Sequence, residues 1–363
     1  MERMNMEDKE EIKNIKFDSL KKLIYDIFIK LNLLPSDAKI IANILSNADL
    51  RGIHTHGVAK IPIYKKRIEL NLINTKPQLK VLKNSSVTAL LDGDFGLGQV
   101  TGYKAMSLAI RKSEKNGVGI VGVRNGQHVG ALGYYAMMAS NKNMLGIATT
   151  NASPSMAAPG SNIKIVGVNP FAIAVPSGIE YKFPIVLDIA CSQVAKSKII
   201  NSIRRGEKNI PDNWALNSKG RHTKIAEEAI NGILMPIGGH KGYGLAVIID
   251  ILAGVITGAA FGKGISSNYG DLINKQRNGL FFMAIKIDNL TNIAVYKKRI
   301  DRFIREIKSS RSSLNDEEVF LPGEKEYRIA EERYHGGISL SNYLYKDLVL
   351  ISTELGIEMQ KYF

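Results

Sequence analysis

Two histidines stand where a side chain could transfer a proton. His56 lies in the polar turn Thr55-His56-Gly57, and His128 follows a predicted strand in the stretch 125–130. Histidine is the usual general acid or base near neutral pH. A helix predicted over 130–141 would place its positive N-terminus close to His128 and would disfavour an imidazolium there. Taken alone, each histidine is more often a structural, hydrogen-bonded side chain than a catalytic one, and this alternative stays open.

Three further side chains could bind or orient an anionic substrate. Lys60 and Tyr64 are four residues apart on a helix predicted to begin near Ala59, so they would share a face and could hold a carboxylate. The alternative is a surface lysine beside a packed tyrosine. Asp188 ends the apolar run 183–188, just before a helix predicted over 191–203, where a carboxylate either faces a ligand or caps the helix. Cys191 has no evident base partner, so we interpret it as packing.

A glycine-rich turn, Pro236–Gly242, leads into a long apolar segment and contains Lys241. Its glycines let the backbone approach a ligand, and a helix that begins there would direct unpaired N–H groups and positive dipole charge at a phosphate. Lys241 would supply the counter-charge. The turn is not a Walker phosphate loop. That loop has four residues between its first glycine and a Gly-Lys pair, followed by Ser or Thr, whereas here Gly238 is followed directly by Gly239. A plain turn before a core helix remains an equal alternative.

The apolar run 245–261 does not resemble a membrane span. It is shorter than the ~20 residues that a span usually needs, and Asp250 lies near its centre. We therefore predict a helix that is buried on all sides within a large protein, and no membrane partner.

A second glycine pattern, Gly117-Val-Gly119-Ile-Val-Gly122, matches the letters of the dinucleotide fingerprint. That fingerprint must follow a strand and open a helix. Here it follows a predicted helix and lies within a predicted strand. The pattern therefore does not support an ordinary Rossmann domain.

Hydrophobic periodicity predicts helices at the start of the chain and an alternation of strands and helices after it. Residues 79–94 alternate like a hairpin with a polar turn at 84–86. Alternating strands and helices indicate an α/β domain with a largely buried sheet. The predicted helices cover 16–31, 35–50, a segment from 59 with Pro62 in its first turn, 98–116, 130–141 and 191–203; the predicted strands cover 118–124, 145–150, 171–175, 184–187 and 279–287.

The composition is that of a globular chain with excess positive charge. The 363 residues carry 49 basic and 34 acidic side chains, a net charge of +15. The densest basic run, 297–311, has the spacing of a solvated helix face, so we interpret the charge as a field that attracts anionic metabolites. One cysteine excludes an internal disulfide and cysteine-based zinc sites, and we predict no metal. With no apolar run in the first residues, we expect a cytoplasmic protein.

Taken together, these segments resemble the malate/L-lactate dehydrogenase family that also contains sulfolactate, ureidoglycolate and diketogulonate enzymes. This family is separate from the Rossmann-type lactate and malate dehydrogenases. The resemblance extends over about residues 17–339 in ordered blocks. These blocks are ADLRGIHTHGVAKIPIY (48–64), LDGDFGLGQV (91–100), NGQHVGALGYYAMMA (125–139), TTNASPSMAAPG (149–160), GVNPFAIAVP (167–176), VLDIACSQVAKSKI (186–199), the stretch 238–262 and LPGE (321–324).

The resemblance implies an α/β fold in which helices cover a large mixed β-sheet, a non-Rossmann nicotinamide-binding fold with helical N- and C-terminal segments. We expect an N-terminal helical segment (1–80) that carries an active-site loop, an α/β core (81–320), and a C-terminal helical segment (321–363) that packs back on the N-terminal part. The family also implies a homodimer with a shared active site. Its members transfer a hydride between NAD or NADP and C2 of a small 2-hydroxy or 2-oxo acid.

The same resemblance suggests roles for individual residues. It implies that Thr55, His56, His128 and Asp188 are catalytic, and that Lys60 and Tyr64 bind the substrate. Lys60 stands where the family usually has arginine and Thr55 where it has serine, so the carboxylate would meet a point charge without a bidentate fork. The implied cofactor-binding residues are Ala152, Asn169, Pro170, Asp188, Ile189, Ala190, His240, Lys241 and Gly242.

Two hypotheses from different classes follow. The first is an NAD(P)-dependent oxidoreductase that acts on malate, lactate, sulfolactate or ureidoglycolate-type acids, with no nucleic acid partner. The second is a basic nucleic-acid-binding protein built on a degenerate enzyme scaffold. The second predicts binding that falls steeply with salt, but the basic residues form no stripe along the sequence.

Overall fold

The computed structural model describes residues 13–204, 206–310 and 318–363 of the chain. Its residues fall into two compact units, one made of the described part of 1–69 together with 325–363, and the other of residues 70–324. Residues 1–12, where a signal sequence would begin, and Arg311, the last residue of the basic run, lie outside the described residues.

The first unit is helical, and chain segments far apart in sequence meet within it. Strand β1 (Lys13–Ile15) pairs antiparallel with β13 (Ile338–Leu340). Helix α1 (Phe17–Lys30) buries Leu20, Leu23 and Ile24 at helical spacing and packs against α2 (Pro35–Leu50). Proline at the first position of α2 needs no N–H partner there. The remaining helices of the unit are α3 (Ile61–Glu69), α10 (Glu324–Gly336, with Glu324 at the boundary) and α11 (Asn342–Glu354).

The second unit is built on a seven-stranded mixed sheet with the order β2-β3-β4-β12-β5-β8-β9. Only the pair β3–β4 is parallel, and the other neighbouring strands of this sheet are antiparallel. The hairpin predicted over 79–94 is confirmed. The strands are β2 (Lys80–Asn84), β3 (Thr88–Asp92), β4 (Val118–Gly126), β5 (Met144–Thr150), β8 (Phe171–Val175), β9 (Ile185–Ile189) and β12 (Asn278–Lys286).

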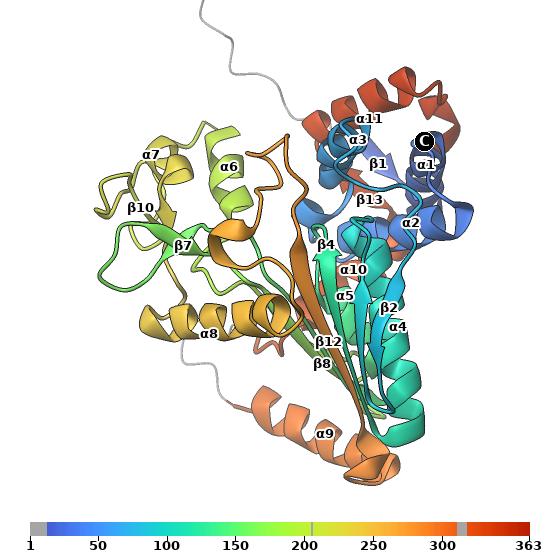
Figure 1. Ribbon diagram of the computed structural model, residues 1–363. Helices are drawn as coiled ribbons and strands as arrows, with labels where there is room; N and C mark the ends of the chain where they lie inside the picture. The colour runs from blue at the N-terminus through green and yellow to red at the C-terminus, as the bar shows by residue number, and fades with distance from the viewer. Residues whose placement is uncertain (1–12, 205, 311–317) are drawn as a thin grey trace, which may run out of the picture. The chain divides into compact units, whose positions relative to one another are not determined.

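Glycines on β4 let other segments pack closely on both faces of this sheet. A Cβ at Gly119 would lie 2.0 Å from the carbonyl oxygen of Ala109 in α4 (Gly98–Asn116), and a Cβ at Gly122 would lie 2.9 Å from Thr257. Odd and even strand positions point to opposite faces, so α4 and the segment after α8 cover opposite faces, and Figure 1 shows α4 and α8 on either side of β12. Two of the three fingerprint-like glycines, Gly119 and Gly122, therefore serve packing.

Two predicted helices begin later than the sequence suggested. Helix α5 spans Gly133–Ser140 and not 130–141, because Gly130 has a φ of 81°, outside the helical region. Helix α6 spans Lys196–Arg204 and not 191–203. Residues just before it are bound elsewhere: the N–H of Cys191 donates to Val168, and that of Gln193 donates to Met235.

The helix predicted to be buried on all sides is in fact exposed along one side. Helix α8 (His240–Asp250) continues into a π-helical turn, Ile251–Val255, and six large apolar side chains on this segment and just beyond it are between 40% and 62% exposed. A continuous apolar run has the same hydrophobic pattern in a fully buried helix and in a helix with one exposed apolar face, so the sequence could not distinguish the two. The six are Leu245, Ile248, Ile251, Val255, Ile256 and Phe261.

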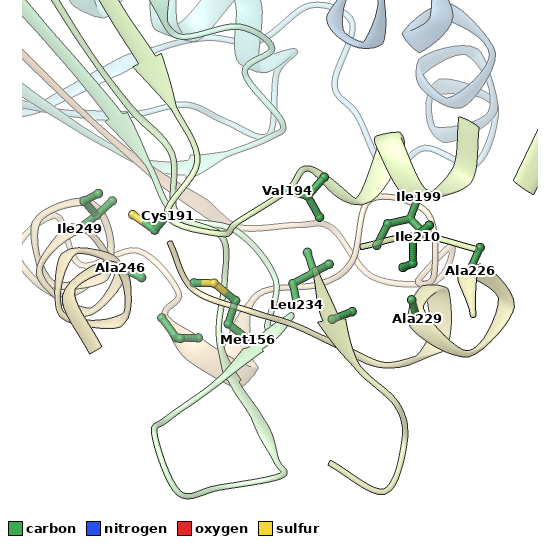
Figure 2. Packing of buried hydrophobic residues seen from close by; sticks show 12 residues of the cluster. Met156, Cys191, Val194, Ile199, Ile210, Ala226, Ala229, Leu234, Ala246 and Ile249 are labelled. Atoms are coloured by element: carbon green, nitrogen blue, oxygen red, sulfur yellow. The ribbon is translucent and has the colours of Figure 1, made fainter. Parts of the chain in front are cut away.

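A smaller hydrophobic core supports the start of α8. It is built around a four-stranded sheet of the order β10-β11-β6-β7 (Ala215–Leu216, Ile233–Leu234, Met156–Ala157, Lys164–Val166) together with α6 and α7 (Ala226–Asn231). Figure 2 shows Cys191 beside Ala246 and Ile249 of α8. Cys191 is fully buried and burial raises the pKa of its thiol to about 11, which agrees with the packing role predicted for it.

The structure tests the predictions about the basic run and about membrane spans. Most of the basic run lies on α9 (Ile293–Lys308), which buries Asp301 and Ile304. Its exposed basic side chains are Lys298, Arg299, Arg302 and Arg305, as predicted for a solvated face, whereas Lys297 and Lys308 are half-buried. Within the described ranges, no helix is long and apolar enough to cross a membrane.

The packing of α4 on β4 gives a test of the fold. In Gly119→Ala the new methyl group would overlap the Ala109 carbonyl, so we expect a loss of about 1–3 kcal/mol in the free energy of unfolding. Chemical denaturation measures this change. The matched control is Gly336→Ala, where a Cβ meets nothing within 4 Å; an equal loss in both variants would contradict the packing argument.

Candidate functional site

Thr55 and His56 lie in a tight turn of the first unit. The turn consists of two short 3-10 segments, His54–His56 and Val58–Lys60, between α2 and α3. The hydroxyl of Thr55 lies 3.0 Å from Nδ1 of His56, so it can fix the orientation of the ring. If Nδ1 accepts that hydroxyl proton, the other ring nitrogen, Nε2, carries the ring proton. The predicted catalytic pair is therefore joined directly.

The environment of His56 strongly favours the neutral imidazole. Burial, and secondly the nearby ammonium group of Lys60, lower the pKa of His56 to about 3. Lys60 is itself only 8% exposed. A buried cation close to a histidine disfavours a second positive charge, and it would favour an anion bound in the same place. The turn thus contains a neutral imidazole and a cation.

The predicted arrangement of Lys60 and Tyr64 needs a correction. Lys60 ends the 3-10 segment and Tyr64 belongs to α3, so the two residues do not share one continuous α-helix. Tyr64 is 1% exposed, which makes it a packed residue in this chain. Helix α3 begins at Ile61, two residues later than predicted, and Pro62 lies in its first turn as expected.

His128 lies in the second unit, where other residues position its backbone. Its N–H donates to Oε1 of the buried Gln276 at 3.0 Å, and the neighbouring Gln127 side chain donates to the carbonyl of Leu72 at 2.8 Å. A Cβ at Gly98 would lie 2.3 Å from the carbonyl oxygen of His128, so α4 begins directly against this segment. Helix α5 begins at Gly133, three residues later than predicted, so an effect of its N-terminus on the His128 ring stays a prediction.

Asp188 caps a different helix from the one predicted. It lies in β9, and its Oδ2 accepts the N–H of Gly133, the first residue of α5, at 2.7 Å. A carboxylate at a helix N-terminus is stabilised by the dipole and by that hydrogen bond. Sequence reasoning expected the following helix because α6 was placed too early.

The glycine-rich turn forms the N-terminus of α8, as predicted. Gly238 and Gly239 have φ values of 58° and 63°, which only glycine adopts without strain, and a Cβ at Gly239 would meet nothing within 4 Å. His240 and Lys241 are exposed, and Gly242 is buried against Ile237 and Cys191. An exposed cation at the start of an 11-residue helix fits a phosphate group.

The segments that carry the predicted cofactor residues meet at this turn. The N–H of Cys191 donates to Val168 and its carbonyl accepts from Ile237, which joins residues 188–190 and 169–170 to the turn before α8. Asn169 is fully buried, accepting from the N–H of Ala152 at 2.9 Å and donating to the carbonyl of Ala246 at 2.8 Å. Its side chain thus holds the cluster together.

The structure therefore brings most of the predicted residues together in two groups, one in each unit. Thr55, His56 and Lys60 share the turn of the first unit. Ala152, Asn169, Pro170, Asp188, Ile189, Ala190, His240, Lys241 and Gly242 lie on the connected segments of the second. Sequence reasoning missed Gln276, which is 148 residues from its partner His128, and Asp49 and Arg333, which contact His54. No local pattern could reveal such distant partners.

The influence of Lys60 on His56 can be measured directly. In Lys60→Met the repulsive charge is removed while the burial remains, so we expect the pKa of His56 to rise from about 3 but to stay below its ordinary value. An NMR titration of the histidine ring measures it. Lys66→Met, at an exposed position of α3, is the matched control. A His56 pKa that is unchanged in Lys60→Met would show that the two groups do not interact.

Comparison with known proteins adds independent evidence. The sequence profile of the family described as malate/L-lactate dehydrogenase matches residues 15–349. The chain is 40% identical over 351 residues to the malate dehydrogenase of Pyrococcus abyssi (94% of each chain) and 39% identical over 348 residues to the L-sulfolactate dehydrogenase of Methanocaldococcus jannaschii (96% of this chain, 99% of that one). The solved structure of the M. jannaschii sulfolactate dehydrogenase matches with a TM-score of 0.89 at 38% identity, over 96% of this chain and 99% of the other. This chain belongs to the malate/L-lactate dehydrogenase family.

Proposed function

We propose that the protein is an NAD(P)-dependent oxidoreductase that transfers a hydride between a nicotinamide and C2 of a small 2-hydroxy or 2-oxo carboxylic acid. Relatives named as malate and L-sulfolactate dehydrogenases, both acting on hydroxy acids, support the reaction class. The observation that carries the proposal is the turn in which the buried Lys60 lies beside the neutral His56. An anionic carboxylate and a hydroxyl or carbonyl group are the partners that suit such a pair.

The charge of Lys60 connects substrate binding to proton transfer. A carboxylate bound beside Lys60 would offset the ammonium charge, and the pKa of His56 would then rise towards the range in which a general acid or base works. Thr55 would hold the ring in one orientation. His128, whose backbone is fixed by Gln276, is the second acid/base candidate, and the two histidines are separable by mutation.

We assign the cofactor site to the second unit. When bound, the nicotinamide supplies the hydride for the reaction. The N-terminus of α8 with Lys241 fits a phosphate, and Asp188, Ile189 and Ala190 lie on a segment that is tied to the same turn through Cys191. A panel with NADH and NADPH decides between the two cofactors.

The nucleic-acid alternative gains no support. The relatives described above are named as dehydrogenases, and basic side chains of α9 pair with acidic neighbours. Three such pairs are Arg302–Glu306, Arg305–Glu180 and Lys308–Glu324.

Kinetics of site variants test the proposed roles. We expect kcat/KM for NADH-dependent reduction of a 2-oxo acid to fall by about 10²–10⁴-fold in His56→Ala or in His128→Asn, whichever residue transfers the proton. Lys60→Ala should raise KM for the acid by removing its counter-charge. His222→Asn, at an exposed histidine, is the control. Unchanged kcat/KM in both histidine variants would contradict proton transfer by either histidine.

We further propose that the protein is a homodimer through the exposed apolar side of α8. Six large apolar side chains in one segment form the kind of surface that a subunit interface covers. We expect sedimentation to give a dimer, and Ile248→Glu with Ile256→Glu to give monomers, because both side chains are more than half exposed. Leu290→Glu, at an exposed position outside this segment, should remain dimeric. A dimer that survives the double substitution would contradict this interface, and an active monomer would contradict a shared active site.

A further inference from the structure

A buried carboxylate holds the turn that carries Thr55 and His56. Asp49, near the end of α2, is fully buried; its Oδ1 lies 3.0 Å from Nδ1 of His54 and its Oδ2 accepts the N–H of Val58 at 2.7 Å. These two contacts lie on either side of His56 in sequence. A Cβ at Gly57 would lie 2.0 Å from the Asp49 carboxylate, so the turn passes directly over this group.

The partners of His54 decide which of its nitrogens carries the proton. Nη1 of Arg333 lies 2.8 Å from Nε2 of His54, and a guanidinium can only donate, so Nε2 is the acceptor. The ring proton therefore lies on Nδ1 and is donated to Asp49. Both ring nitrogens are used, which excludes His54 as a proton-transfer group and makes it a bridge between an acid and a base.

Arg333 connects this bridge to a distant part of the chain. The same Nη1 also donates to the carbonyl oxygen of Asp49 at 2.6 Å. Arg333 lies in the last turn of α10, 279 residues from His54, and both belong to the first unit. One side chain thus binds the end of α2 and the start of the turn at once.

We propose that Asp49, His54 and Arg333 are positioning residues that fix the turn bearing Thr55 and His56, so that α10 controls the orientation of the His56 ring. This inference rests on the proposed function for its kinetic part only. The network places no group on the substrate. It determines where the Thr55 hydroxyl and the His56 ring lie, and a displacement of a catalytic group of about 1 Å costs on the order of 10²-fold in rate.

The kinetic test uses Arg333→Met, Arg333→Lys and His54→Asn in the full-length protein. We expect kcat for reduction of a 2-oxo acid to fall about tenfold or more in Arg333→Met and His54→Asn, because the turn loses hydrogen bonds that hold it in place. Arg333→Lys should restore part of the rate by supplying one donor. KM for the nicotinamide should change less than about twofold, since the proposed cofactor residues lie in the second unit. Arg302→Met, at an exposed arginine paired with Glu306, is the control.

A spectroscopic test is independent of activity. In protein labelled with ¹⁵N-histidine, and with His54→Asn to assign the resonance, the ring of His54 should have a protonated Nδ1 and a bare Nε2. In Arg333→Met the Nε2 resonance of His54 should shift. The Nδ1 resonance of His56, the atom next to the Thr55 hydroxyl, should broaden. If His54 is protonated on Nε2 in the wild type, or if Arg333→Met keeps the wild-type kcat, the proposal is overturned. If no 2-oxo acid is reduced but the His54 ring behaves as described, the proposed function fails and the network stands.

Discussion

The proximity of a buried cation to a histidine is the constraint on which the chemistry depends. Lys60 and His56 share one short turn, and burial together with the lysine charge keeps the imidazole neutral. Two positive charges cannot coexist at low cost in such a place, whereas a cation and a bound carboxylate can. We therefore propose that the turn binds an anion before any proton is transferred. Its own geometry is set by Asp49, whose carboxylate binds on both sides of it.

In the second unit, hydrogen bonds bring separate chain segments together at the start of one helix, α8. Asn169 is fully buried and bonds both Ala152 and Ala246, and Cys191 bonds residues on two other segments. Removing either partner of such a buried hydrogen bond would leave a polar group without a partner, so these bonds hold the segments together. Close packing at Gly119 and Gly98 adds to this rigidity. A cofactor site on such a frame is positioned by the core and needs no glycine fingerprint.

Local patterns in the sequence predicted most of the elements. The spacing of Leu20, Leu23 and Ile24 predicted α1, and alternation around Asn84 predicted the hairpin, because both signals depend only on near neighbours. The start of α5 was misplaced because the φ of Gly130 depends on the turn around it.

The candidate site was predictable in its residue types but not in its contacts. The sequence predicted His56 in a turn and Lys60 on the helix after it, and the family resemblance named the remaining positions. That Lys60 belongs to the same turn as His56 was not predicted. Arg333 and Gln276 could not be found, since their partners lie far away in sequence. The exposed side of α8 was also missed, because an apolar helix has the same sequence pattern whether its own chain covers all of its sides or leaves one side exposed.

The central claim is that a hydride passes directly between a nicotinamide and C2 of a hydroxy or oxo acid. It is tested most directly by supplying NADH and NADPH deuterated on either face of C4, together with 2-oxo acids, and by analysing the product by mass spectrometry. The account predicts deuterium on C2 of the hydroxy acid from one face of one cofactor. Product without the label from either face, or no reduction of any 2-oxo acid with either cofactor, would contradict it.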